Sequence, residues 1–326
     1  MARVIVHAKS CDFDPVLECG LSRERPLDSR VPPGPAHGRA VAWEILLNTP
    51  PKYRAPALAL AALAARLAPA AQAANTPPSC GGPSAFLAVI GRPTAEDSGC
   101  AVPQGMFDVE VGATAGNLYP APGGRLYTVP NLTLRWGLHD NSELVWLPPG
   151  FQYQSANAGP GAPAMTAHGF GPTTIGLKHV LGWNDDWQWT AEVLTTLPSG
   201  DSTFGSHGAG GALNAIVSYG NGPLGLSLMV GETSATEPTS AGGQRFESFN
   251  PDLVATWAAT ARIQLFGEIY AQSHSGYQQG WGTNADGGVQ YLATPRLVVD
   301  VEEGIRIQGA LGGFSNYTGV GLGLLF

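Results

Sequence analysis

The sequence ends in the stretch N-Y-T-G-V-G-L-G-L-L-F, from Asn316 to Phe326. In its second half, apolar residues at alternate positions are separated mainly by glycines. Because side chains in a strand alternate between two faces, this stretch predicts a strand with one apolar face and one nearly bare face. Such a strand fits the wall of a membrane barrel, where one face meets lipid and the other lines a lumen. A buried strand of a soluble β-sandwich shows the same alternation, so the rest of the chain must separate the two.

Similar alternating segments recur from Gly105 to the end of the chain. Short turn signals such as Gly220–Pro223 and Thr294–Pro295 separate some of them, and longer stretches rich in Gly, Pro, Ser and Thr separate others. At roughly 10 residues per strand plus connections, residues 105–326 have room for about 12 strands. We therefore expect an all-β fold, a single transmembrane antiparallel up-and-down β-barrel of about 12 strands.

The composition supports a barrel rather than a soluble domain. Charged residues make up 13% of the chain, whereas about a quarter is usual in soluble domains. No apolar run reaches the roughly 20 residues that a membrane-spanning helix needs. After residue 73 the chain holds 8 of its 17 basic residues but 19 of its 25 acidic residues. This acidic balance argues against a nucleic-acid partner.

The first 73 residues differ in character from the rest. Residues 1–51 show no sustained periodicity, and we interpret them as a disordered or mis-annotated lead. A basic patch, an alanine- and leucine-rich run and an A-Q-A box follow in residues 52–73, which is the order of parts in a secretory signal peptide. An alanine-rich amphipathic helix is the alternative. We expect cleavage near Ala73 and export to the cell outer membrane.

The exported chain would begin with residues 74–104, a segment that precedes the first strand and is short enough to enter the barrel mouth as a lumen plug. It contains Cys80 and Cys100, the last two of the four cysteines. In an oxidising compartment these two can form a disulfide around a loop. Two free thiols are the alternative.

Polar members of the alternating pairs recur on one face, which would be the lumen face of a barrel. The lumen-facing candidates are Asp108, Glu110, Arg135, Lys178, Glu192, Arg262, Phe266, Glu268, Tyr270, Asp300 and Glu302. We expect most of the charges to pair with one another and to brace the wall, and the acidic excess to favour cations. The sequence contains no nucleophile elbow, zinc motif or phosphate loop with a basic residue. We therefore expect no catalytic residues, metal or cofactor.

Several short motifs resemble the outer-membrane family of transporters of the meta-pathway of phenol degradation. Among them are Arg92-Pro93 ahead of Val102–Gly105, Leu134–Leu138, Leu197–Gly200 and Asp286–Leu292. The resemblance spans residues 92–326 and implies a barrel that passes small, largely apolar or aromatic compounds. The terminal pattern of Val320, Leu322, Leu324 and Phe326 similarly resembles the assembly signal of bacterial outer-membrane barrels. This implies outer-membrane lipid and the barrel-assembly machinery as partners.

Two functions remain open from the sequence. The chain is a channel or facilitated-diffusion transporter for small hydrophobic or aromatic compounds, or it is a non-transporting barrel that braces the membrane or displays its loops. Apolar and aromatic lumen residues would favour the first, and a lumen filled by paired charges the second. We also expect a wet glycine face on the last strand, so that Gly323→Ser is tolerated far better than Leu322→Arg or Leu324→Arg.

Overall fold

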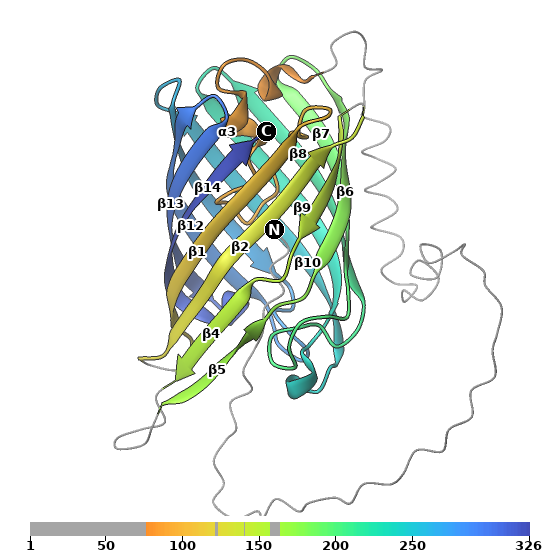
Figure 1. Cartoon of the computed structure of the whole chain (residues 1–326), viewed down its shortest axis with the longest axis vertical. Helices are drawn as coiled ribbons and strands as arrows, with labels where there is room; N and C mark the ends of the chain where they lie inside the picture. The colour runs from red at the N-terminus through yellow and green to blue at the C-terminus, as the bar shows by residue number, and fades with distance from the viewer. Residues whose placement is uncertain (1–75, 121–122, 140, 157–163) are drawn as a thin grey trace, which may run out of the picture. The chain divides into compact units, whose positions relative to one another are not determined.

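The computed structural model describes residues 76–120, 123–139, 141–156 and 164–326. They form a β-barrel with an N-terminal segment inside its lumen (Figure 1). The lead and the signal peptide expected in residues 1–73 lie outside the described residues.

The wall consists of antiparallel strands in chain order. They are β1 Phe107–Leu118, β2 Arg125–Gly137, β3 Ser142–Leu147, β4 Phe151–Ala156, β5 Met165–Phe170, β6 Thr174–Trp183, β7 Trp187–Thr196, β8 Gly210–Asn221, β9 Leu224–Thr236, β10 Arg245–Ala258, β11 Ile263–Gln272, β12 Gly282–Thr294, β13 Leu297–Gln308 and β14 Phe314–Leu325. Short helical turns are η1 Pro78–Cys80, α3 Ala85–Val89, η2 Thr239–Ala241 and η3 Leu311–Gly313.

The barrel closes because β1 pairs with both β14 and β2. One end of β2 pairs with β3 and its other end with β4, so β3 and β4 follow each other along one side of the wall. Pro148 and Pro149 separate these two strands, and Pro172 lies between β5 and β6. Proline has no N–H for the ladder, which explains why the strands are interrupted there. The closed ring therefore has 12 strands, which confirms the expected fold.

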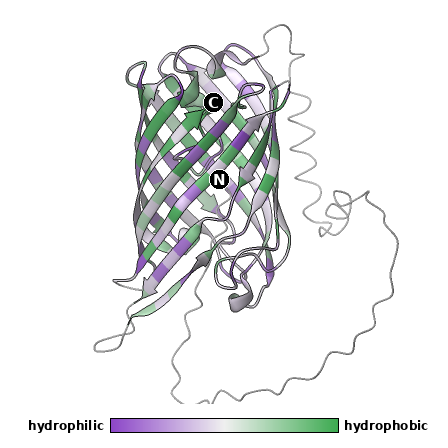
Figure 2. Ribbon diagram, viewed as in Figure 1, coloured by the Kyte–Doolittle hydropathy of each residue, from purple (hydrophilic) through white to green (hydrophobic). Residues whose placement is uncertain are grey.

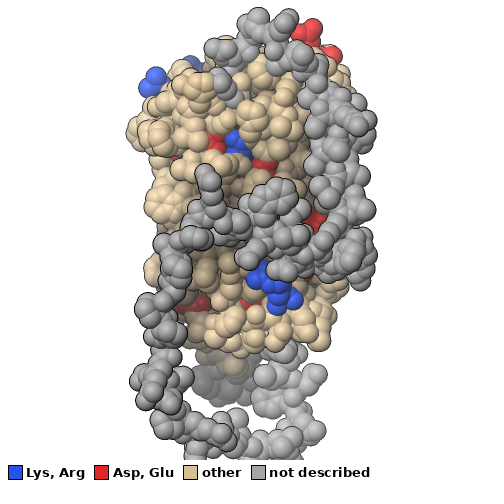
Figure 3. Space-filling view, turned by 90° about the vertical axis from the view of Figure 1, so that its right-hand side faces the viewer, with Lys and Arg blue, Asp and Glu red and all other residues tan. Residues whose placement is uncertain are grey.

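The two faces of the wall differ as the alternation predicts. Large apolar side chains such as Leu253, Ile269 and Val301 lie exposed on the outside, whereas charged side chains of the same strands are buried inside. Figure 2 shows the resulting alternation along the strands. In the space-filling view of Figure 3, uncharged residues cover most of the visible wall. No helix among the described residues is long and apolar enough to cross a membrane.

Connections at the two ends of the barrel differ in length. The hairpins β8–β9 and β12–β13 turn within two residues, at the end where the chain terminates. At the other end, residues 197–209 and 237–244 form longer loops. Short turns mark the periplasmic end of an outer-membrane barrel.

The last strand has its apolar face outside and its glycine face inside. The exposed fraction is 52% for Val320 and 58% for Phe326, and Leu322 is also exposed. On the inside, a Cβ at Gly323 would collide with Ile90 of the N-terminal segment. The expectation of a wet glycine face is therefore wrong, because protein rather than water covers this face; the expected tolerance of Gly323→Ser relative to Leu324→Arg stays a prediction.

Candidate functional site

The site is built around residues 76–104, which we call the inner segment. It begins at the end of the barrel that carries the short turns, forms α3 and returns to β1 (Figure 1). Phe86, Leu87 and Val89 of α3 are buried against apolar residues of the wall. Those wall residues are Leu292, Val298 and Leu325, on β12, β13 and β14. Burial of these apolar side chains therefore helps to hold the inner segment against the wall.

A disulfide joins Cys80 to Cys100, the pair named from the sequence. Both cysteines are buried, and the bond closes a loop with a sequence separation of 20. The loop holds α3 and the deepest part of the inner segment. The cross-link reduces the conformational freedom that the segment gains when it leaves the lumen.

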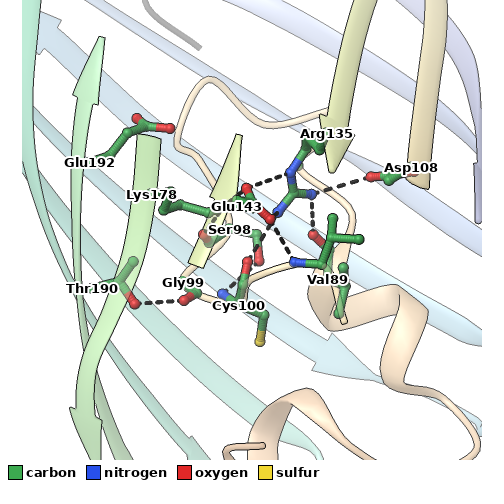
Figure 4. A network of polar contacts seen from close by, with 12 residues as sticks. Val89, Ser98, Gly99, Cys100, Asp108, Arg135, Glu143, Lys178, Thr190 and Glu192 are labelled. Carbon is green, nitrogen blue, oxygen red and sulfur yellow. Dashed lines mark hydrogen bonds and ion pairs between the residues drawn. The ribbon is translucent and has the colours of Figure 1, made fainter. Parts of the chain in front are cut away.

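An ion-pair cluster lies on one side of the lumen, and we call it the clamp (Figure 4). Arg135 Nε donates to Glu143 Oε1 at 2.8 Å, and Arg135 Nη1 lies 3.3 Å from Asp108 and 3.2 Å from Glu110. Lys178 Nζ lies 2.9 Å from Glu143. All five side chains are almost completely buried. Burying so many charges is costly, and their close pairing offsets this cost.

The clamp also holds the backbone of the inner segment. Arg135 donates to the carbonyl oxygens of Val89 and Cys100, and Lys178 Nζ donates to that of Ser98 at 2.9 Å. Two bases on neighbouring parts of the wall thus bind three carbonyl groups on both arms of the disulfide loop (Figure 4). Hydrogen bonds from charged donors are among the stronger ones in proteins.

A second ion pair fixes the middle of the inner segment. Arg92 donates to both carboxylate oxygens of Asp300 on β13, at 3.0 and 3.2 Å. Its guanidinium group lies against Gly112 on β1 and Gly321 on β14, where any Cβ would overlap with it. The glycines of these two paired strands therefore make the space that Arg92 needs.

Acidic side chains bind the inner segment from the opposite wall. Glu268 on β11 accepts hydrogen bonds from the backbone N–H groups of Ala95 at 2.9 Å and Glu96 at 2.8 Å. The Glu96 side chain accepts a hydrogen bond from the Ser227 hydroxyl through Oε1. Burial and the nearby Glu268 raise the pKa of Glu96 to about 8, although the Ser227 hydrogen bond opposes the shift.

Inward-facing acids continue across the neighbouring strands. Asp286 on β12 lies directly opposite Glu268 in the sheet. Asp252 on β10 and Glu302 on β13 are also buried. The hydroxyl oxygen of Tyr317 lies 2.9 Å from Asp286 and 3.1 Å from Glu302, which share its one proton. This side of the lumen is thus lined by carboxylates that stand next to one another.

A cavity of about 410 Å³ remains between the inner segment and strands β7–β12, and we call it the side cavity. It extends to the hairpin turn at Gly222 and Pro223, at the end of the barrel that carries the short turns. Its walls combine apolar side chains of both partners with small hydroxyl and amide groups. None of the described residues that line it is Lys, Arg or His.

Most residues predicted to face the lumen are buried on inward positions of the wall. These are Asp108, Glu110, Arg135, Lys178, Glu192, Phe266, Glu268, Asp300 and Glu302. Tyr270 lies half-buried on the same face of β11 as Phe266. Arg262 differs from the prediction, because β11 begins at Ile263 and Arg262 lies exposed in the preceding turn. The alternation of β11 begins one residue after Arg262.

Several important residues were not predicted. Glu143 lies at the centre of the clamp on a strand of six residues, where alternation with Leu144 and Trp146 could have identified it. Arg92 and Glu96 lie in the non-periodic inner segment, where no pattern marks a role. Among the described residues, no group of three or more His, Cys, Asp or Glu side chains could hold a metal ion.

Comparison with known proteins identifies the family. A model described as "Putative MetA-pathway of phenol degradation" matches residues 90–310. The chain belongs to this family. This confirms the resemblance found in the sequence motifs, and the matched range covers most of the barrel and the second half of the inner segment. No curated protein matches this chain.

Solved structures share the fold at low sequence identity. The COG4313 outer membrane channel from Pseudomonas putida F1 is similar, with 15% identity, a TM-score of 0.54, and coverage of 72% of this chain and 100% of that chain. The NanC porin has 13% identity and a TM-score of 0.44, and the match covers 67% of this chain and 98% of that chain. The monoaromatic hydrocarbon channel CymD has 12% identity and a TM-score of 0.36, with coverage of 68% and 88%. The first of these shows that the fold occurs in an outer-membrane channel.

Proposed function

We propose that this protein is exported by its N-terminal signal and inserted into the outer membrane, where it conducts small hydrophobic or aromatic compounds. The proposal rests on the lining of the lumen. On the side of β9–β11 the inner segment leaves a cavity with an apolar floor that includes Val254 and Phe266. Aromatic and apolar linings with a few polar groups are typical of sites for small organic molecules. Membership in a family described by phenol degradation supports the same solute class.

The inner segment would then act as a plug. Wall side chains bind it from both sides of the lumen, so a solute must pass beside it or wait for it to move. The barrel-assembly machinery and outer-membrane lipid are the partners that the terminal strand implies. The exposed pattern of Val320, Leu322 and Phe326 supports this assignment. The proposed activity includes no chemical step on the solute.

Uptake by intact cells tests the proposal. Initial uptake of radiolabelled phenol at limiting concentration would be compared between cells that produce the full chain and cells that carry an empty vector. A sugar of similar size serves as the control solute. We expect faster uptake of phenol and little change for the sugar. Equal uptake of phenol by both cell populations would contradict the proposal.

A second function is a barrel that braces the membrane without transport. The clamp favours it, because paired charges fill one side of the lumen and fix the inner segment. In that case the protein would alter the resistance of the membrane to detergent, and phenol uptake would be unchanged.

A further inference from the structure

Glu303 interrupts an apolar row on the outer face of β13. It lies between Val301 and Ile305 on the outward positions of the strand, and its side chain is exposed. Val299 and Ile307 continue the row in the two directions and are also exposed. The row extends for about 26 Å along the strand, which covers most of an apolar band that is roughly 25 Å tall and crossed at a tilt. Glu303 is the middle residue of the row, so it lies deep within the band.

Glu232 on β9 is an acid on the outer face at a less costly depth. Its ladder neighbours Leu213 and Phe249 are exposed on the outside. The apolar outward residues of β9, from Leu224 to Val230, all precede it, so it lies beside the end of the band that is nearer the long loops. Charged side chains on the outer face of a barrel cost most at the middle of the band and little near its edges. Glu303, unlike Glu232, therefore needs a partner.

The Glu303 carboxyl group has one hydrogen bond within the part of the chain that the structure describes. The Thr318 hydroxyl on β14 donates to its Oε1 atom at 2.6 Å. An ionisable side chain inside a membrane is costly and as a rule marks a functional contact. Water and lipid headgroups do not reach the middle of the band, so the partner must be a protein that spans the membrane.

The ladder row that contains Glu303 otherwise has small side chains. Its outward residues are Ala255, Gly267, Gly287, Thr318 and Ala115, on β10, β11, β12, β14 and β1. A Cβ at Gly267 would meet nothing within 4 Å, so the backbone is open on that side. Small residues allow membrane-spanning elements to approach closely and to pack by van der Waals contact. A second wall can therefore come within hydrogen-bond reach of Glu303.

A second copy of this chain provides the matching group. A twofold axis along the membrane normal places identical residues of two copies at the same depth. A protonated carboxyl group both donates and accepts, so two such groups satisfy each other. We propose that two copies pair in the membrane through the row from Ala255 to Ala115, with their Glu303 carboxyl groups hydrogen-bonded to each other at the twofold axis.

Sedimentation equilibrium of the full chain in density-matched detergent at pH 6.5 tests the proposal. We expect a reversible equilibrium between one and two copies. Glu303→Leu should raise the dissociation constant of the pair about tenfold, as loss of a hydrogen-bonded contact implies. Glu303→Gln should keep most of the pairing, because an amide group also donates and accepts. Glu232→Leu makes the same change near the edge of the band and should leave the constant unchanged.

A further variant tests the surface around the acid. Gly267→Phe places a ring on the paired surface and should weaken pairing as well. Heat-modifiable gel mobility shows that each variant is a folded barrel. A chain that remains a single copy at every concentration would overturn the proposal. Equal dissociation constants for the unchanged chain and Glu303→Leu would also overturn it.

His179 on β6 tests a head-to-tail contact. It also lies outward between apolar residues, Leu177 and Leu181, and its Nδ1 atom lies 2.8 Å from Ser142 Oγ. If Glu303 met His179 of a neighbouring copy, different faces of the barrel would join, and such contacts give rings or open rows. His179→Leu should leave the pair intact. Loss of pairing in this variant would overturn the twofold contact.

Discussion

The two sides of the lumen hold the same inner segment by different means. On the clamp side, Arg135 and Lys178 bind backbone carbonyl groups, and buried acids neutralise both bases. On the other side, Glu268 binds two N–H groups, and the wall next to it leaves the side cavity open. Removal of one partner from a dense set of buried charges lowers stability far more than detachment of groups that lie beside a cavity. Movement of the inner segment should therefore begin on the cavity side.

The largest effect is expected from loss of the central base of the clamp. Arg135→Ala leaves Glu143, Asp108 and Glu110 buried around a missing cation, and we expect a loss of about 3–5 kcal/mol in the free energy of unfolding. Urea titration of the refolded protein in lipid measures it. Arg296→Ala, in an exposed turn, is the control and should change little. If both variants unfold at the same urea concentration, the clamp does not hold the barrel together.

Loss of the disulfide should have the next-largest effect. A Cys80→Ser/Cys100→Ser double variant frees a loop whose closure contributes at most about 3 kcal/mol. The clamp still binds both arms, so we expect the barrel to remain folded while protease cuts the inner segment faster. The unreduced protein should also have a mass lower by two hydrogens than the reduced protein. Full labelling by a thiol reagent before reduction would contradict the cross-link.

A glycine on the inner face of β14 tests how Arg92 attaches the inner segment to the wall. Gly321→Val should force the Arg92 guanidinium away from Asp300 and cost about 1–3 kcal/mol, as overpacking does. Gly267→Val is the matched control, because Gly267 faces outward on β11 and its Cβ would meet nothing within 4 Å. Protease sensitivity of the inner segment should rise in the first variant alone. The same sensitivity in both would mean that Arg92 does not need the glycine surface.

Alternation was enough to predict the wall and most of its inward charges, because a strand places every second side chain on one face. It could not predict which charges meet. Arg135 and Glu143 lie on consecutive strands, β2 and β3. Lys178 lies directly opposite Glu143 on β6, and this pairing of β3 with β6 depends on the interrupted strands near Pro148. The role of Arg92 depends on an irregular segment folded into a closed barrel. The glycines of β14 were visible in the sequence, yet their purpose became clear only with Arg92 and Ile90 against them.

The smallest effect, taken for a single pH unit, separates the two sides by pH. In the docked inner segment the pKa of Glu96 is raised to about 8, and a released segment would return it to the ordinary value of 4.5. The neighbours Glu268, Asp97 and Asp252 are also acids, and within the described part of the chain Ser227 donates the one hydrogen bond that the Glu96 carboxyl group accepts. Between these two pKa values, the Glu96 carboxyl group therefore keeps its proton in the docked state and loses it in the released state. Docking is most favourable at low pH, and it weakens as the pH rises from about 4.5 to about 8.

The weakening should be at most about 1.4 kcal/mol per pH unit within that range and should level off above it. The measurement is the rate of proteolysis of the inner segment from pH 5 to pH 9, divided by the rate for a Glu96→Gln variant to remove the pH dependence of the protease. We expect the ratio to increase up to about pH 8, because the glutamine side chain of the variant carries no titrating proton while the clamp is the same in both proteins. A ratio that stays constant over the whole range would show that Glu96 does not exchange a proton when the segment moves. The pH would then not distinguish the cavity side from the clamp.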